Sequence, residues 1–351
     1  MYDIFSDFIK DKKRLCVIQA ENPDADSLGS ALALDLLLND HEISLFCPVD
    51  IPKYLHYFED WSRVSRDFDF NADGYIIVDT ASEILLSKLL SDPAIRNRLA
   101  VSPIFVLDHH ETEDDLPFAH QGLVQTLPAC CDLIFKVARE QGIMPDPKTL
   151  NLAGSTNSSD DAEAQPDSSA TRFRTAAAYL LYGILSDTLG LTAATVSADT
   201  FRVCAELTDY GLNIGELDEK RREFMKKSQK ILSYKGDLIK KVEYWNDGRL
   251  ATVHISWEEI QEYSNEYNPS VLILEELRLV EGVEVAVCIK TYPDGKVTGK
   301  IRSITPVADQ LAGYFGGGGH PYAAGFRTYD LSYDDTIHEI ITALSQIEEA
   351  K

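Results

Sequence analysis

Aspartate and histidine side chains that could bind a metal ion occur at four places in the N-terminal part of the chain, each beside an apolar segment. Carboxylate oxygens together with one or two imidazoles suit Mn²⁺ or a similar divalent ion. Two such ions that share an aspartate can hold a phosphate between them and lower the pKa of a bound water, which supplies hydroxide. The pattern therefore indicates a divalent-metal site that could hold a phosphate-containing ligand. Its candidate residues are Asp24, Asp26, Asp79, Asp108, His109, His110 and Asp187.

Each of these residues also has an ordinary structural role open to it. An isolated aspartate at a helix start is usually a cap, and Asp26 stands just before the helical segment that begins at Leu28. The adjacent imidazoles of His109 and His110 could be buried and satisfied by hydrogen bonds alone. The recurrence of acids beside several strands favours the metal site over a set of unrelated caps.

The apolar segments beside these residues are short and bounded by polar residues or proline, so they predict buried strands. Strands that alternate with helices indicate an α/β fold, with a parallel sheet and helices on both faces. The carboxyl ends of parallel strands lie along one edge, where distant residues can converge on a ligand. The predicted strands are residues 15–20, 43–47, 75–79 and 104–108, and the predicted helices are residues 28–38, 171–186 and 199–210.

A chain of 351 residues is longer than one hydrophobic core usually holds, so two domains are predicted. We place the first at residues 1–210, a connecting helical segment at 211–235 and a smaller α+β domain at 236–351, with a ligand cleft between the domains. The turn Pro293-Asp294-Gly295 would join two strands of the second domain. Its predicted strands are residues 249–255, 283–291 and 296–303, and its predicted helices are residues 306–315 and 333–348.

Two stretches differ in composition from the rest of the chain. Residues 153–170 contain no large apolar side chain, so they predict a flexible insertion in the first domain, either neutral or regulatory. Residues 220–241 carry nine Lys and Arg side chains in an otherwise acidic protein. We interpret them as the solvated face of a connecting helix rather than as a phosphate-facing patch.

The chain is strongly acidic, with 57 Asp and Glu against 33 Lys and Arg and a formal net charge of −24. This charge argues against a broad cationic groove for long nucleic acid, because neutralising phosphates supplies most of that affinity. Binding of a small anionic ligand is still compatible with this net charge if metal ions and a few basic side chains are concentrated at its site.

The six cysteines show no C-x-x-C spacing and stand mostly in apolar surroundings, which is typical of buried free thiols in a reducing cytoplasm. The start of the chain lacks the basic and apolar regions of a signal peptide, and no apolar run reaches the length of a membrane span. We therefore expect a cytoplasmic protein with no membrane partner.

A run of glycines at residues 316–319 precedes His320 in the second domain. Consecutive glycines let a backbone approach a phosphate, and a helix start after them would add a favourable dipole. A flexible turn is the ordinary alternative. Arg302 would supply a bidentate fork for the same phosphate. The candidate substrate-binding residues are Arg302, Ser303, Gly317, Gly318, Gly319 and His320.

Six segments together resemble the DHH phosphoesterases that carry a DHH-associated C-terminal domain. The first four look like the four motifs of the DHH domain, in the family's order, and the last two are similar to the C-terminal domain. Within the family, the chain looks most like the branch of nano-RNases, pAp phosphatases and linear or cyclic dinucleotide phosphodiesterases. The segments are Asn22-Pro23-Asp24-Ala25-Asp26-Ser27-Leu28-Gly29-Ser30, Val78-Asp79, Leu107-Asp108-His109-His110, Gly183-Ile184-Leu185-Ser186-Asp187-Thr188, Lys300-Ile301-Arg302-Ser303 and Gly316-Gly317-Gly318-Gly319-His320-Pro321-Tyr322-Ala323-Ala324-Gly325-Phe326.

The resemblance implies two bound Mn²⁺ ions, with Mg²⁺ as the alternative metal. Asp79 would bridge the two ions. Asp24 would hold one of them, and Asp26, His109 and Asp187 would hold the other. Asp108 and His110, on either side of His109, would complete the catalytic site.

The resemblance also implies that Asp108 and His110 are the catalytic residues. Asp108 would orient its neighbours, and His110 would face the scissile phosphate as a charge stabiliser or proton donor. The glycine-rich block would hold the terminal phosphate or the base of the substrate.

Ala20 departs from the family's pattern, because the family normally has His four residues before Asp24. Alanine cannot ligate a metal, so Gln19, Glu21, Asn22 or water would have to replace the imidazole, and Glu21 is chemically the best substitute. This departure would weaken one of the two metal sites.

The fourth motif departs from the pattern as well. After Asp187-Thr188, the chain has Leu189-Gly190-Leu191 where many relatives have Gly followed by a basic residue and Phe. Both departures would shift the metal preference or the substrate, or reduce activity.

We therefore predict a metal-dependent phosphoesterase that hydrolyses short oligonucleotides or small nucleotides, such as dinucleotides, pAp and cyclic di-AMP, through metal-activated water. Two other functions stay open. Ala20 is compatible with a catalytically weakened nucleotide-binding regulator, and the metal residues would also suit a pyrophosphate or polyphosphate hydrolase. We expect a small nucleotide as the partner, no long nucleic acid, and a homodimer.

Overall fold

The computed structural model describes residues 2–110, 114–150, 168–329 and 331–349. The chain divides into two compact units, Met1–Met225 and Lys226–Lys351. The division falls inside the segment predicted to connect the domains, which contains α8 (Ile214–Phe224) and the start of α9 (Gln229–Lys240). The predicted insertion at residues 153–170 lies outside the described residues as far as residue 167. Within the described ranges, no helix is both long and apolar enough to cross a membrane.

The first unit is built on a six-stranded sheet in which all neighbouring strands are parallel. The strand order is β3-β2-β1-β4-β5-β6, so the order reverses between β1 and β4. The predicted parallel α/β fold is confirmed, and the structure adds β3 and β6 at the two edges. The strands are β1 (Arg14–Ile18), β2 (Glu42–Phe46), β3 (Val64–Ser65), β4 (Gly74–Val78), β5 (Ile104–Asp108) and β6 (Gln121–Val124).

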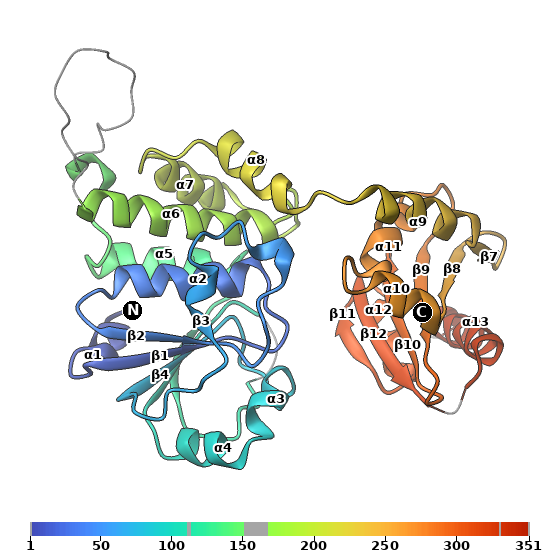
Figure 1. The fold of residues 1–351 in the computed structure, drawn as a ribbon, viewed down its shortest axis with the longest axis horizontal. Helices are drawn as coiled ribbons and strands as arrows, with labels where there is room; N and C mark the ends of the chain where they lie inside the picture. The colour runs from blue at the N-terminus through green and yellow to red at the C-terminus, as the bar shows by residue number, and fades with distance from the viewer. Residues whose placement is uncertain (1, 111–113, 151–167, 330, 350–351) are drawn as a thin grey trace. The chain divides into compact units, whose positions relative to one another are not determined.

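Helices cover both faces of this sheet (Figure 1). The central strands β4 and β5 are buried along their whole length, which explains their unbroken apolar sequences. Alternate residues of β1 belong to different cores, with Val17 in one and Ile18 in the other. The first core contains residues of α1 (Asp3–Ile9), α2 (Ala25–Leu37), α5 (Cys130–Glu140), α6 (Ser168–Asp187) and α7 (Ala198–Thr208), and the second contains residues of α3 (Ser87–Leu90) and α4 (Pro93–Ala100).

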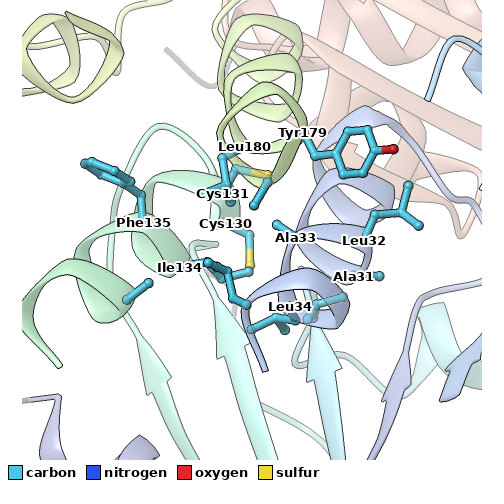
Figure 2. Packing of buried hydrophobic residues seen from close by; sticks show 14 of the residues in the cluster. Ala31, Leu32, Ala33, Leu34, Cys130, Cys131, Ile134, Phe135, Tyr179 and Leu180 are labelled. Carbon is cyan, nitrogen blue, oxygen red and sulfur yellow. The ribbon is translucent and has the colours of Figure 1, made fainter. Parts of the chain in front are cut away.

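Three helices of the first core pack closely around Cys131 at the start of α5 (Figure 2). A Cβ atom on Gly29 of α2 would lie 2.6 Å from the carbonyl oxygen of Tyr179 on α6. A Cβ atom on Gly183 of α6 would lie 2.3 Å from Cys131 Sγ and 2.7 Å from Asp26 Oδ1. The missing side chains therefore allow the helices to approach, and this approach brings the start of α5 to the carboxylate of Asp26.

The second unit has a separate six-stranded sheet in the order β11-β12-β10-β9-β8-β7. Strands β8 and β9 are parallel, and the other neighbouring strands are antiparallel. The turn predicted at Pro293-Asp294-Gly295 joins β9 to β10, and Gly295 has a φ of 79°, which glycine adopts without strain. The strands are β7 (Glu243–Trp245), β8 (Leu250–Ile255), β9 (Val285–Thr291), β10 (Val297–Ser303), β11 (Gly318–His320) and β12 (Ala323–Thr328).

Helices also form a core on each face of the second sheet. The predicted α+β organisation of this unit is therefore confirmed. One core includes residues of α9, α10 (Trp257–Tyr263) and α11 (Pro269–Arg278), and the other includes residues of α12 (Ala308–Tyr314) and α13 (Tyr333–Glu349).

Lysines of α9 pair with glutamates on the neighbouring helices. These pairs involve three of the nine basic residues at 220–241, and they favour the interpretation of this stretch as a helix face. The pairs are Lys230 with Glu262 at 3.1 Å, Lys235 with Glu276 at 2.6 Å and Lys241 with Glu259 at 2.6 Å.

Candidate metal centre

The predicted metal residues meet at the carboxyl edge of the first sheet, where the strand order reverses. Asp79 directly follows β4 and is buried. Its N–H donates to the carbonyl oxygen of Leu107 in β5 at 2.8 Å, and its φ of 64° lies in the left-handed region. Residues other than glycine rarely adopt this conformation, and such strain is concentrated at functional sites.

His109 stands among three carboxylates. Its Nε2 atom lies 3.3 Å from Asp79 Oδ1, 3.4 Å from Asp187 Oδ2 and 3.7 Å from Asp26 Oδ2. Its Nδ1 atom lies 2.9 Å from the carbonyl oxygen of Leu127. A carbonyl oxygen can only accept a hydrogen bond, so Nδ1 carries a proton and Nε2 is the ring atom that would bind a metal. This is the usual way in which a protein prepares a histidine to bind a metal.

Two lone-pair atoms face each other at the centre of this group. Asp79 Oδ1 and His109 Nε2 are both buried, and neither has a hydrogen-bond partner among the described residues. The two atoms lie 3.3 Å apart. A cation bound to both atoms would satisfy them, so the residues present fit a divalent metal ion.

Asp26 is held by the start of α5. Its Oδ2 accepts from the N–H of Cys130 at 2.6 Å, and its Oδ1 accepts from the N–H of Cys131 at 2.9 Å. The N-terminus of a helix stabilises negative charge, so the carboxylate is kept in place although it is fully buried.

Asp24, rather than Asp26, is the N-cap of α2. Its Oδ1 accepts from the N–H groups of Asp26 and Ser27, both at 3.0 Å. The alternative interpretation of Asp26 as a helix cap is therefore wrong, because α2 begins at Ala25 and Asp26 lies in its first turn. The cap holds Asp24 at the sheet edge. The carboxylate of Asp26 instead accepts hydrogen bonds from the start of α5.

Asp108 organises the two histidines that follow it. Its buried Oδ1 accepts from the N–H of His109 and from Nδ1–H of His110, both at 2.8 Å. The second contact commits Nδ1 of His110 to Asp108. The structure thus holds this histidine in one orientation through a carboxylate that is itself buried.

The carboxylates of the cluster repel one another, and this repulsion appears in their proton affinities. Burial, followed by the charges of Asp26, Asp24, Asp187 and Asp108, raises the pKa of Asp79 well above its usual range. Burial, followed by Asp26 and Asp24, raises the pKa of Asp187 to about 8. Burial and Asp26 also raise the pKa of Asp24. A divalent cation would offset this accumulation of negative charge.

Among the residues that the structure describes, two groups of ligand atoms are close enough to hold a metal ion. In each group the atoms lie within 4.8 Å of one another, and His109 belongs to both. The groups are Asp79, His109 and His110, and Asp26, His109 and Asp187. The second group is the ligand set that the family resemblance implies for one ion, whereas Asp24 belongs to neither group.

The residues around Ala20 differ in whether they could replace the missing imidazole as a metal ligand. Ala20 is 6% exposed, and its methyl group offers no ligand atom. Glu21, chemically the best substitute for the missing imidazole, is engaged elsewhere: its carboxylate accepts from the N–H of Lys88 at 2.7 Å and from Ser87 Oγ at 3.2 Å. Gln19 is fully buried, and both polar atoms of its side chain lack partners among the described residues.

The predicted substrate-binding residues of the second unit lie on β10 and on β11, except Gly317, which directly precedes β11. Arg302 of β10 has its Nε atom 3.4 Å from Glu275, and its Nη1 donates to the carbonyl oxygen of Ile301 at 3.0 Å. Ser303 is buried, and its hydroxyl donates to the carbonyl oxygen of Thr305 at 2.6 Å. The guanidinium is therefore held near the sheet, and the hydroxyl is used within the unit.

The glycine run forms a strand rather than a loop before a helix. Gly318 and Gly319 belong to β11, which pairs with β12, and the next helix begins only at Tyr333. The expected contribution of a helix dipole is therefore wrong. A Cβ atom on Gly317 would lie 2.2 Å from the carbonyl oxygen of Gly325, and one on Gly319 would lie 2.6 Å from Ala324 Cα, so these two glycines serve close backbone packing. The side chain of His320 lies outside the described residues.

The backbone groups that hold the cluster were not foreseen from sequence. They are the carbonyl of Leu127 and the N–H groups of Cys130 and Cys131. The sequence feature that could have indicated the helix start is the helical spacing of apolar residues at 130–140, shortly after Pro128.

Comparison with known families agrees with this geometry. Residues 14–155 match the DHH family, N-terminal domain, and residues 260–350 match the DHHA1 domain. These matches, together with the cluster of carboxylates and histidines at the sheet edge, indicate a phosphoric ester hydrolase. The chain belongs to the DHH family, and one matched domain lies in each compact unit.

Curated relatives are similar over almost the whole chain. The bifunctional oligoribonuclease and PAP phosphatase NrnA of Thermus thermophilus is 26% identical over 331 residues, which cover 93% of this chain and 87% of the relative. The probable bifunctional oligoribonuclease and PAP phosphatase NrnA of Streptococcus mutans is 24% identical over 326 residues, 90% of each chain.

The whole fold also occurs in a solved structure. An exopolyphosphatase-related protein from Bacteroides fragilis aligns with a TM-score of 0.81 at 17% identity, over 99% of this chain and 96% of that one. At this identity the likeness shows the fold alone.

Proposed function

We propose that the chain hydrolyses short oligonucleotides and small nucleotides such as pAp, with Mn²⁺ as its metal. The observation that carries the proposal is the convergence of Asp26, Asp79 and Asp187 on Nε2 of His109, at 3.3 to 3.7 Å. The names of the relatives from Thermus thermophilus and Streptococcus mutans support the nucleotide substrates.

We assign Asp26, His109 and Asp187 to one ion and Asp24 to the other, with Asp79 shared between them. When bound, the ions would supply Lewis-acid activation of a water molecule and neutralise the charge of the phosphate. The hydrogen bonds from the start of α5 to Asp26 and from His109 to Leu127 keep two of these ligands in place before any ion arrives.

His110 is the proposed contact to the scissile phosphate. Its Nδ1 proton is held by Asp108 at 2.8 Å, so Nε2 is the atom that would stabilise charge or donate a proton to the leaving oxygen. We propose that the second unit binds the terminal phosphate or the base of the substrate. Its proposed contacts are Arg302, Ser303, Gly317, Gly318, Gly319 and His320.

We further propose that the protein acts in the cytoplasm as a homodimer and not on long nucleic acid. All six cysteines are free and buried, which supports a reducing compartment. The formal charge of −24 supports small substrates.

A nucleotide-binding regulator with weakened activity is the second candidate. It is supported by Ala20, which offers no ligand, and by the engagement of Glu21 with Ser87 and Lys88. In that case the substrate would still bind, but the ion beside Asp24 would be held too weakly for turnover.

Hydrolysis assays separate the candidates. Labelled dinucleotides, pAp, cyclic di-AMP and pyrophosphate are incubated with the full chain and Mn²⁺ or Mg²⁺, beside Asp79→Asn, which keeps the size of the side chain but removes its charge. We expect turnover of dinucleotides and pAp by the unaltered chain and its loss in Asp79→Asn.

The other outcomes are equally informative. Nucleotide binding without turnover of any substrate would contradict the proposal and favour the regulator. Turnover of pyrophosphate alone would identify a phosphoanhydride hydrolase.

A further inference from the structure

We infer that a pocket in the first unit binds a nucleobase beside the scissile phosphate. The pocket has a volume of about 680 Å³, which is within the usual range of small-molecule sites. Asp24 and Ser186 form part of its wall. Asp24 is a proposed metal ligand, and Ser186 directly precedes another, Asp187, so the pocket adjoins the metal centre. The inference rests on the proposed function and assigns a place to a part of the substrate that the ions do not bind.

Aromatic rings form one part of the pocket wall. Tyr54 lies in the short helix η1 (Lys53–Leu55) and is 49% exposed, so its ring is accessible to a ligand. Tyr57 and Tyr182 are buried behind the wall surface and make a T-shaped contact with ring centroids 4.7 Å apart. Tyrosine rings are the surfaces on which single-stranded bases stack, and such stacking tolerates any base.

Exposed aliphatic side chains form another part of the wall. Leu189 is 68% exposed and Ile214 is 43% exposed. Large apolar side chains that gather around one cavity indicate a ligand that covers them. Leu189 also stands where the fourth motif departs from the family's pattern, so this departure changes the wall of the pocket.

The charges of the wall select a base rather than a phosphate. They comprise the carboxylates of Asp24 and Asp218 and the guanidinium of Arg221. Arg221 is already paired with Asp218, through Nε at 3.1 Å and Nη2 at 2.6 Å. A second phosphate would therefore meet more negative than positive charge, whereas an uncharged planar base would meet rings, aliphatic groups and a few polar edges.

Two substitutions in the full chain with Mn²⁺ test this assignment. Tyr54→Ala removes the accessible ring, and Leu189→Asn removes apolar surface at a residue whose φ of 51° asparagine tolerates. We expect Tyr54→Ala to raise KM for a dinucleotide about ten-fold, the scale of one stacked base, with a smaller change in kcat. Leu189→Asn should raise KM in the same direction. Tyr244→Ala, an equally exposed tyrosine on β7, is the matched control.

Two dinucleotide analogues, each lacking one base, identify the base concerned. We expect Tyr54→Ala to have no effect on KM for one of them, because the base that would stack is absent, and to keep its effect on the other. An unchanged KM for the complete dinucleotide in both variants, with thermal unfolding unchanged, would overturn the assignment.

Direct binding separates this inference from the proposed function. The dinucleotide is titrated into the full chain with Ca²⁺ in place of Mn²⁺, so that no turnover is needed. Weaker binding by Tyr54→Ala would support the pocket even if no variant hydrolyses the dinucleotide. Equal binding by Tyr54→Ala and the unaltered chain would overturn it.

Discussion

His109 is the residue on which the candidate metal centre depends. Its Nδ1 proton is committed to Leu127, so its Nε2 lone pair stands beside the carboxylates of Asp26, Asp79 and Asp187. The cluster holds more negative charge than its own hydrogen bonds can stabilise, as the raised pKa of Asp79 shows. Protons or metal ions must therefore compensate it.

Ala20→His should strengthen the metal site beside Asp24, because it restores an imidazole that the family pattern has at this position. We expect Mn²⁺ to bind there about ten-fold more tightly or better, the scale on which single partners of a metal act. Isothermal titration with Mn²⁺ measures this affinity. Ala20→Leu is the control, since it adds similar bulk to a buried position without a ligand atom, and equal Mn²⁺ affinity in both variants would contradict the prediction.

Removing metal should make the stability of the protein depend on pH. The pKa of Asp187 is raised to about 8, so the folded chain keeps a proton that the unfolded chain releases near 3.8. The free energy of unfolding should therefore fall as the pH rises between these values. Thermal unfolding in EDTA at about pH 5.5 and about pH 8.5 measures this fall, which Mn²⁺ should reduce.

Asp187→Asn provides the control for this pH dependence, because its amide does not titrate. The variant should show a smaller fall in melting temperature between the two pH values. A fall of the same size in Asp187→Asn and the unaltered chain would show that other groups cause it.

At the scale of elements, the ends of three helices hold the acids of the cluster. Asp24 caps α2, the start of α5 donates to Asp26, and Asp187 is the last residue of α6. The first two positions favour a carboxylate, whereas the carboxyl end of a helix disfavours one. Close packing of α2, α5 and α6 is what brings these ends together (Figure 2).

Gly183→Ala should disturb this packing. The new methyl group would lie 2.3 Å from Cys131 Sγ and 2.7 Å from Asp26 Oδ1, so α5 or α6 must shift. We expect a loss of ~1–3 kcal/mol in the free energy of unfolding, together with weaker Mn²⁺ binding. Urea denaturation and metal titration measure the two effects.

Gly236→Ala is the matched substitution, because Gly236 lies inside α9 with no atom within 4 Å of its added Cβ. Alanine there should stabilise the chain by ~0.5–1 kcal/mol, since it favours a helix more than glycine does. Equal effects of the two substitutions would mean that close packing at Gly183 does not control the stability of the chain.

At the scale of the whole molecule, the chain consists of two units with separate sheets and separate cores. The candidate metal centre lies entirely in the first unit, and the glycine-rich strand β11 lies in the second. The formal charge of −24 is distributed over a chain whose basic helix α9 is paired with glutamates. A net charge of this sign would repel a long phosphate backbone.

Hydrolysis should slow as the oligonucleotide becomes longer. Extra phosphates beyond those at the metal centre meet an acidic surface, so we expect the rate per 3′ or 5′ end to fall from about two to about twenty nucleotides. Added salt should narrow the difference, because it screens repulsion between exposed charges. Rates that are independent of length at low salt would contradict the prediction.

The sequence by itself determined the central strands of the first sheet and the residue types of the candidate centre. Central strands of a parallel sheet are buried on both faces, so β1, β4 and β5 appear as continuous apolar segments. The edge strands β3 and β6 are short and only partly buried, and no such pattern marks them. The convergence of the acids followed from the rule that parallel strands end at one edge.

Only the tertiary structure decided how each carboxylate is used. Asp24 became the cap of α2 and Asp26 the acceptor at α5, although the two acids stand two residues apart and either could cap a helix. The carboxylate of Glu21 accepts hydrogen bonds from Ser87 and Lys88 rather than joining the candidate metal centre. These choices depend on which distant backbone N–H groups packing brings within reach, and local sequence patterns contain no information about those distances.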